Sequence, residues 1–129
     1  MVVVNNLTTL RVDNNFIKKT AEMVLFGEKK SNQDISLVLV SSDKMQALNQ
    51  QYRRKNKPTD VLTFPELDIV ICPKVVKENA QAAQTTFKDE LARVVIHGVL
   101  HWLDYDHEIG EKEAEAMSNK EAKYFKKNQ

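Results

Sequence analysis

The sequence predicts a single domain with four strands and five helices that are interspersed along the chain. Its 129 residues suit one domain built around one hydrophobic core. Its composition, 42% hydrophobic and 29% charged, is typical of globular proteins. Short runs of β-branched residues, typical of strands, are interspersed with longer segments in which apolar residues follow the helical period. The expected strands are 2–4, 34–41, 61–64 and 68–73, and the expected helices are 14–26, 42–52, 73–83, 87–103 and 111–126.

Capping residues delimit the first two helices. Asp13 or Asn14 is expected to cap the first helix, which ends near Gly27. Ser42 or Asp43 is expected to cap the second, whose apolar positions continue to its end. We interpret the first of these helices as an element that packs on the core.

The strands differ in the clarity of their patterns. Residues 34–41 are the clearest strand, and apolar side chains on both of its faces predict a central place in the sheet. The connection between strands 61–64 and 68–73 is short, which is compatible with a compact hairpin. Cys72, the only cysteine, is expected to face the core as a small hydrophobic residue.

The three C-terminal helices have distinct signals. Pro73 can open the first of them at its first turn. Thr86-x-x-Asp89 resembles a capping box for the next, which is apolar over most of its surface and should be deeply buried. The last, 111–126, has a thin apolar stripe that Glu121 interrupts, so we expect it to pack at the edge of the core.

All three histidines of the chain lie within eleven residues, at His97, His101 and His107. Residues four apart on a helix share one face, with Cβ atoms about 5–6 Å apart, so two imidazoles there can converge on one ion. A chain that leaves the helix near Asp104 and doubles back can bring His107 to the same point. Three nitrogen ligands leave one position of a tetrahedral zinc for water, which is typical of a catalytic site. The alternative is that the histidines are satisfied core residues, which explains less well why all three cluster.

Gly98 stands where the metalloprotease motif H-E-x-x-H has its general base, which argues against a peptidase. A glycine inside a helix costs about 1 kcal/mol relative to alanine. We therefore expect a strand or a substrate backbone to approach the helix closely at this position.

Residues 52–60 form a dense basic cluster, Y-R-R-K-N-K-P-T-D, in a chain whose net charge is only +1. Nucleic-acid binding would therefore have to use a local patch. Arg53 stands at a helix end beside an aromatic residue, and the planar donors of arginine suit phosphate. The alternative is a solvated charged loop.

Three features indicate a cytoplasmic protein. A single cysteine excludes an intrachain disulfide and suits a reducing compartment. The sequence has no apolar run of membrane-spanning length, and its N-terminus lacks the basic region of a signal peptide. We expect no membrane partner.

Two of these segments resemble the YbeY family of bacterial ribosomal-RNA maturation factors, which are small metal-dependent endoribonucleases. Residues 97–107 match the family signature H-G-x-L-H-L-x-G-Y-D-H, and residues 48–64 match its block L-N-x-x-Y-R-x-K-x-x-P-T-D-V-L-S-F. The resemblance implies an α+β fold with a small four-stranded mixed sheet, on which the H-x-x-x-H helix packs centrally in a zincin-like arrangement. It also implies that residues 1–129 form a single metal-dependent endoribonuclease domain.

The resemblance further implies a site and a reaction. His97, His101 and His107 would bind zinc or a similar divalent ion such as nickel, and Arg53 would be the functional arginine. The implied activity is single-strand-specific cleavage of RNA in maturation of the small-subunit rRNA 3′ end and in ribosome quality control. The implied partners are ribosomal RNA or ribosomal particles, with no DNA and no membrane.

Other roles follow from this hypothesis. Arg53 would neutralise charge on the phosphoryl oxygens, Arg54 and Lys55 would guide the RNA backbone, and Asp106 would hold an imidazole tautomer. Two alternatives stay open: a ribosome-assembly RNA-binding protein with a purely structural metal, and a metal hydrolase of another substrate, such as a peptide.

The chain departs from the family pattern at three places. Asp104 replaces a glycine that is expected at a positive-φ helix end. Trp102 replaces a leucine, and the connection 64–68 is shorter than is usual in the family.

Overall fold

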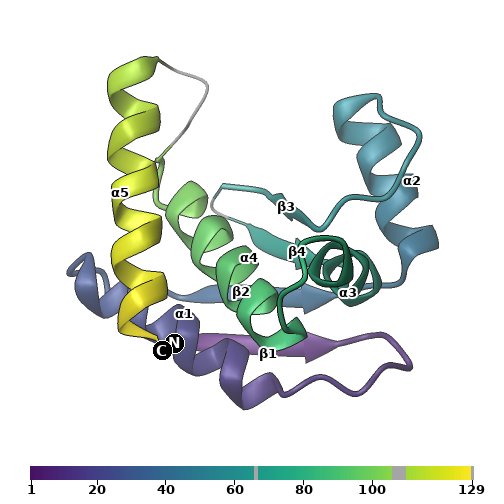
Figure 1. Cartoon of the computed structure of the whole chain (residues 1–129), viewed down its shortest axis with the longest axis horizontal. Coiled ribbons are helices and arrows are strands. Elements are labelled where there is room, and N and C mark those ends of the chain that lie inside the picture. The colour runs from purple at the N-terminus through teal and green to yellow at the C-terminus, as the bar shows by residue number, and fades with distance from the viewer. Residues whose placement is uncertain (66, 106–109, 129) are drawn as a thin grey trace.

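The protein is described by a computed structural model that covers residues 1–65, 67–105 and 110–128. It has an α+β fold with one four-stranded mixed sheet and five helices, as predicted (Figure 1). In chain order the elements are β1 (Val2–Asn6), α1 (Asn14–Gly27), β2 (Ile35–Leu39), α2 (Ser42–Arg53), β3 (Val61–Thr63), β4 (Asp68–Ile71), α3 (Pro73–Ala82), α4 (Phe87–Trp102) and α5 (Glu111–Lys127).

The strands lie in the order β1-β2-β4-β3. Strand β2 is parallel to both of its neighbours, and β3 is antiparallel to β4. The central place expected for β2 is therefore confirmed, and β3 and β4 form the hairpin that their short connection suggested. All three apolar residues on one face of β2, namely Ile35, Leu37 and Leu39, are almost fully buried.

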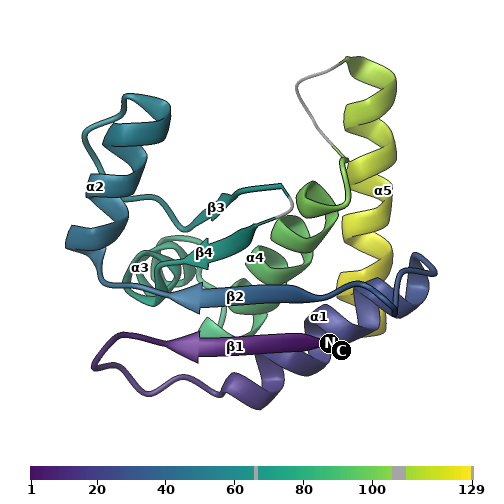
Figure 2. The same ribbon diagram turned by 180° about the vertical axis from the view of Figure 1, so that it is seen from behind.

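Helix α4 is the centre of the helical layer. It contacts β3, β4 and the helices α1, α3 and α5, whereas α2 lies at the far end of the molecule from α5 (Figures 1 and 2). Its apolar residues from Leu91 to Leu100 join the main core, as its sequence predicted. In the described ranges, no helix combines the length and the apolar character that crossing a membrane requires.

Side-chain caps begin three of the helices. The Asp13 side chain accepts a hydrogen bond from the Phe16 amide at 3.0 Å, and Thr86 accepts one from the Asp89 amide at 3.0 Å. The predicted cap of α2 was wrong by one residue, because the Ser41 hydroxyl, and neither Ser42 nor Asp43, performs this role. Serine and aspartate are both strong N-cap residues, so the sequence pattern alone did not distinguish Ser41, Ser42 and Asp43.

Every strand differs from its expected bounds at one end or both, and β2 and β3 are shorter than expected, at Ile35–Leu39 and Val61–Thr63. Strand β1 continues through Asn6, because its register with β2 runs as far as Leu39. Strand β4 ends at Ile71, since Cys72 is the residue that precedes the first turn of α3. Cys72 is fully buried, as expected, and burial raises the pKa of its thiol.

Helix α5 reaches the core through two large side chains. Met117 and Tyr124 are both 0% exposed, whereas the other described residues of α5 are exposed or half-buried, so α5 packs at the edge of the core as predicted and inserts two side chains into it. The two residues are seven positions apart and therefore share one face of the helix. Their size lets a narrow stripe fill the core, and the tyrosine hydroxyl has a carboxylate partner there, described below.

Gly98 is the point where α4 comes closest to the hairpin. A Cβ atom there would lie 3.0 Å from Ile69 Cγ2 and 3.4 Å from Val61 Cγ2. The expected approach of a strand is confirmed, because Ile69 belongs to β4 and Val61 to β3. The lost helix propensity of this glycine is thus offset by close packing of α4 on the sheet.

Replacing Gly98 with valine should therefore lower the free energy of unfolding by about 2 kcal/mol, the middle of the range for overpacking a core. Chemical denaturation measures this loss, with the exposed Ala116→Val in α5 as a control for valine in a helix. A Gly98→Val protein as stable as the control would show that the hairpin moves freely away from α4.

Candidate metal centre

His97 and His101 lie side by side on α4. Their ring centroids are 4.5 Å apart and the ring planes meet at 69°. Both residues are half-buried, and the His97 side chain is 32% exposed. The helix spacing therefore brings the two imidazoles together as expected, within reach of solvent at one side.

His107 and Asp106 lie outside the described residues, and their predicted roles stay predictions. Within the part of the chain that the structure describes, no group of three histidine, cysteine, aspartate or glutamate side chains is arranged to hold a metal ion. Two adjacent imidazoles nevertheless provide nitrogen donors of the kind that zinc, nickel, copper or iron(II) accept. The described residues thus fit part of a metal site.

Glu121 is a residue of this site that sequence reasoning missed. Its Oε2 atom lies 2.8 Å from His97 Nδ1, and its side chain is 27% exposed. The signal was present in the sequence, because Glu121 interrupts the apolar stripe between Met117 and Tyr124. A residue between two buried positions on the same helix face has to point toward α4 as well.

A pocket of about 210 Å³ opens beside His97. It contains residues from both sequence segments that resemble the YbeY family, because Asp60 and Val61 from before and within β3 meet His97 there. Its full lining is Asp60, Val61, Glu90, Arg93, Val94, His97 and Glu121. The fold therefore joins segments that are more than thirty residues apart in the sequence.

Arg53 lies at the C-terminal end of α2, where it is exposed. In both views β3 runs between α2 and α4 (Figures 1 and 2). The neighbouring Tyr52 ring meets the Phe64 ring edge-on, with centroids 5.1 Å apart, which connects this end of α2 to the hairpin. Among these described residues, no hydrogen bond or ion pair joins Arg53 to His97 or His101.

The basic turn after α2 is tied back to the helix by a buried amide. Asn49, 1% exposed, donates a hydrogen bond from Nδ2 to the Lys57 carbonyl at 2.8 Å. The Lys55 amide in turn donates to the Asn49 carbonyl at 3.3 Å, and Arg54 adopts a left-handed conformation with φ 57°. Arg54 and Lys55 are therefore exposed on a turn that is held from two sides.

The end of α4 shows how this chain accommodates two of its departures from the family pattern. Asp104 has φ 75°, and its amide and that of Tyr105 donate to the carbonyls of His101 and Leu100 at 2.9 and 3.0 Å. This is a Schellman motif, in which aspartate tolerates the position that glycine usually takes. Trp102 donates a hydrogen bond from Nε1 to the Leu67 carbonyl at 3.2 Å, so it contacts the shortened hairpin connection.

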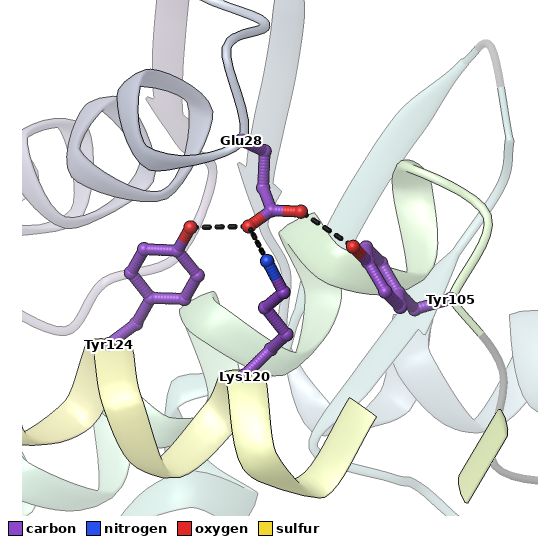
Figure 3. A network of polar contacts seen from close by, with 4 residues as sticks. All are labelled: Glu28, Tyr105, Lys120 and Tyr124. Carbon is purple, nitrogen blue, oxygen red and sulfur yellow. Dashed lines mark hydrogen bonds and ion pairs between the residues drawn. The ribbon is translucent and has the colours of Figure 1, made fainter. Parts of the chain in front are cut away.

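A polar cluster around Glu28 joins α5 to the C-terminal ends of α1 and α4. The Glu28 carboxylate accepts hydrogen bonds from Tyr105 at 2.7 Å, from Lys120 at 3.0 Å and from the Tyr124 hydroxyl (Figure 3). Burial alone would raise the Glu28 pKa, but these three donors together lower it below its ordinary value. The pKa of Tyr124 is raised, first by burial and then by its bond to the carboxylate. Glu28 is therefore an ionised buried group that fixes the position of α5.

Comparison with known proteins connects this architecture to one family. A family model described as Endoribonuclease YbeY matches residues 3–129. A relative of that name from Thermotoga maritima is 46% identical over 96 residues, which cover 70% of this chain and 64% of the relative. Another, from a Sulfurihydrogenibium species, is 32% identical over 127 residues, which cover 90% of this chain and 84% of the relative.

A solved structure extends the comparison to the fold. The solution structure of TM1509 from Thermotoga maritima superposes with a TM-score of 0.74 and 34% sequence identity, over 99% of this chain and 89% of that one. The Thermotoga sequence alignment, by contrast, spans less than two thirds of that relative's length.

Proposed function

Because the chain belongs to the Endoribonuclease YbeY family, we propose that it is a metal-dependent endoribonuclease that cleaves single-stranded RNA. The observation that carries this proposal is the pocket in which His97, its carboxylate partner and Asp60 meet. His97, His101 and His107 would hold one zinc ion, with nickel as an alternative. When bound, such an ion supplies Lewis-acid activation of a phosphoryl oxygen and of water.

The basic residues of α2 and its turn would bind the substrate. Arg53 neutralises the charge that develops on the phosphoryl oxygens, through the paired donors of its guanidinium group. Arg54 and Lys55 guide the RNA backbone by binding its phosphates. Asp106 orients one of the imidazoles by accepting a hydrogen bond from it.

The RNA would be ribosomal, and the reaction would serve maturation of the small-subunit 3′ end and ribosome quality control in the cytoplasm. This finer assignment rests on the resemblance of residues 48–64 and 97–107 to the family motifs. The partial exposure of His97 to a pocket supports a catalytic metal over a purely structural one, because structural zinc sites are closed by four protein ligands.

Arg53→Ala should lower the rate of single-stranded RNA cleavage by about 100- to 1,000-fold, as expected when a donor to developing charge is lost. Arg53→Lys should restore only part of the rate, because lysine keeps the charge without the paired donors. The rate is measured on a labelled oligonucleotide with zinc-loaded protein, before and after treatment with a chelator.

The matched control is Arg11→Ala, which removes another exposed arginine from the same chain. It should cleave at the wild-type rate. Cleavage that survives both Arg53→Ala and removal of the metal would contradict the proposed function.

A further inference from the structure

The contact between Glu121 and His97 has a chemical consequence that the proposed reaction does not include. The two residues are 24 positions apart, and Glu121 Oε2 lies 2.8 Å from His97 Nδ1. An ionised carboxylate can only accept hydrogen bonds, so the hydrogen of this contact belongs to Nδ1. In a neutral imidazole, a hydrogen on Nδ1 leaves the lone pair on Nε2.

The carboxylate is held in place by the helix that carries it. One turn before Glu121, Met117 is fully buried, and three residues after it Tyr124 is fully buried too. Lys120 and Tyr124 also bind Glu28, at the end of α1. Helix α5 cannot rotate or slide along α4 without losing these contacts, so Glu121 is positioned before any ligand arrives.

The neighbouring histidine indicates what this arrangement is for. The His101 ring lies 4.5 Å from the His97 ring on the same face of α4, as expected for two nitrogen donors that share an ion. With its Nδ1 bound to Glu121, His97 has one nitrogen, Nε2, with a lone pair to donate. A carboxylate that binds the outer nitrogen of a metal-binding histidine fixes its tautomer and increases its basicity.

We propose that Glu121 is a positioning residue, which locks His97 as the Nδ1–H tautomer and so presents Nε2 to a divalent metal ion. The proposal deepens the proposed function, since it takes His97 as a metal ligand. Its first consequence, the tautomer, concerns the metal-free protein and can be measured separately.

The tautomer is read from long-range ¹H–¹⁵N spectra of the histidine rings in metal-free protein, at about pH 8, where an ordinary imidazole is neutral. Wild-type His97 should be the Nδ1–H tautomer. Glu121→Gln should keep it, because the amide oxygen still accepts the hydrogen bond, whereas Glu121→Ala should move His97 toward the Nε2–H form. Glu115→Ala, an exposed glutamate of the same helix, is the control and should leave the spectrum unchanged.

Zinc affinity, measured by competition with a chromogenic chelator, is the second readout. Glu121→Ala should weaken zinc binding by about 10- to 100-fold, the usual cost of losing such a partner, while Glu121→Gln should bind within about tenfold of wild type. Circular dichroism establishes that each variant is folded.

Two outcomes would overturn the proposal. The first is an unchanged Nδ1–H tautomer in Glu121→Ala. The second is zinc binding as weak in Glu121→Gln as in Glu121→Ala, which would make the carboxylate itself a ligand. Failure of the proposed function would be recognised by a different result. His97→Ala would then bind zinc like wild type, because His97 would not be a metal ligand, whatever its tautomer in the metal-free protein.

Discussion

Replacing His97 with alanine should lower zinc affinity by more than roughly 100-fold, which exceeds the usual loss for a residue that only supports a ligand. The substitution removes one nitrogen donor of a pair whose rings are 4.5 Å apart. It also leaves the half-buried carboxylate of Glu121 without the imidazole it binds. RNA cleavage at limiting zinc should fall by a similar factor, because the fraction of protein that holds the ion sets the rate.

Elemental analysis of the purified variant and chelator competition measure the first effect, and cleavage of a labelled single strand measures the second. Lys88→Ala, which alters an exposed residue of the same helix, should behave like wild type in both assays. A His97→Ala protein that retains one equivalent of zinc and cleaves RNA normally would remove this histidine from the site.

Replacing Glu28 with alanine should lower the free energy of unfolding by about 3 kcal/mol. The Glu28 side chain is only 7% exposed and accepts hydrogen bonds from Tyr105 and Tyr124. Hydrogen bonds to a charged group contribute roughly 1.5–3 kcal/mol each, and they are not fully additive. The Lys120 side chain is 35% exposed, so its ion pair adds little. Urea denaturation measures the loss, and Glu22→Ala, an exposed position of α1, is its control.

The same carboxylate should make stability depend on acidity. Burial opposes ionisation of Glu28, but its three donors outweigh burial and hold its pKa below the ordinary glutamate value. The unfolded chain therefore takes up this proton at a higher pH than the folded protein. The stabilisation is complete above the ordinary glutamate pKa and is lost as pH falls through the folded value.

Glu28→Gln should accordingly show a shallower loss of stability between about pH 5 and pH 3 than wild type. Glu22→Gln should leave the slope unchanged, since Glu22 is exposed. Equal slopes for wild type and Glu28→Gln would contradict the account of this cluster.

Much of the fold could be predicted because its signals are local. The apolar faces of residues 34–41 and the caps at Asp13 and Thr86 are set by neighbours within four positions. The full burial of Tyr124 in α5 could not be predicted in this way. It depends on the hydroxyl of Tyr124, which finds a carboxylate partner 96 positions away in the sequence.

The site too has a part that local sequence spacing predicted and a part that depends on tertiary packing. Helix geometry alone placed His97 beside His101, because a spacing of four residues fixes which side chains are neighbours. Glu121 and Asp60 reach the same pocket from other elements, and their approach depends on how α5 and β3 pack against α4. A search for polar interruptions of apolar stripes would have selected Glu121 from the sequence.

The order of the chain gives the contact between α4 and α5 a consequence during synthesis. A ribosome makes a protein from its N-terminus, and folding can begin before the chain is complete. His97 and His101 emerge before Glu121 does, so for a time the nascent protein has its histidine pair without the carboxylate that orients it. The contact that orients His97 therefore forms only after the helix that follows the histidines has been translated and has docked.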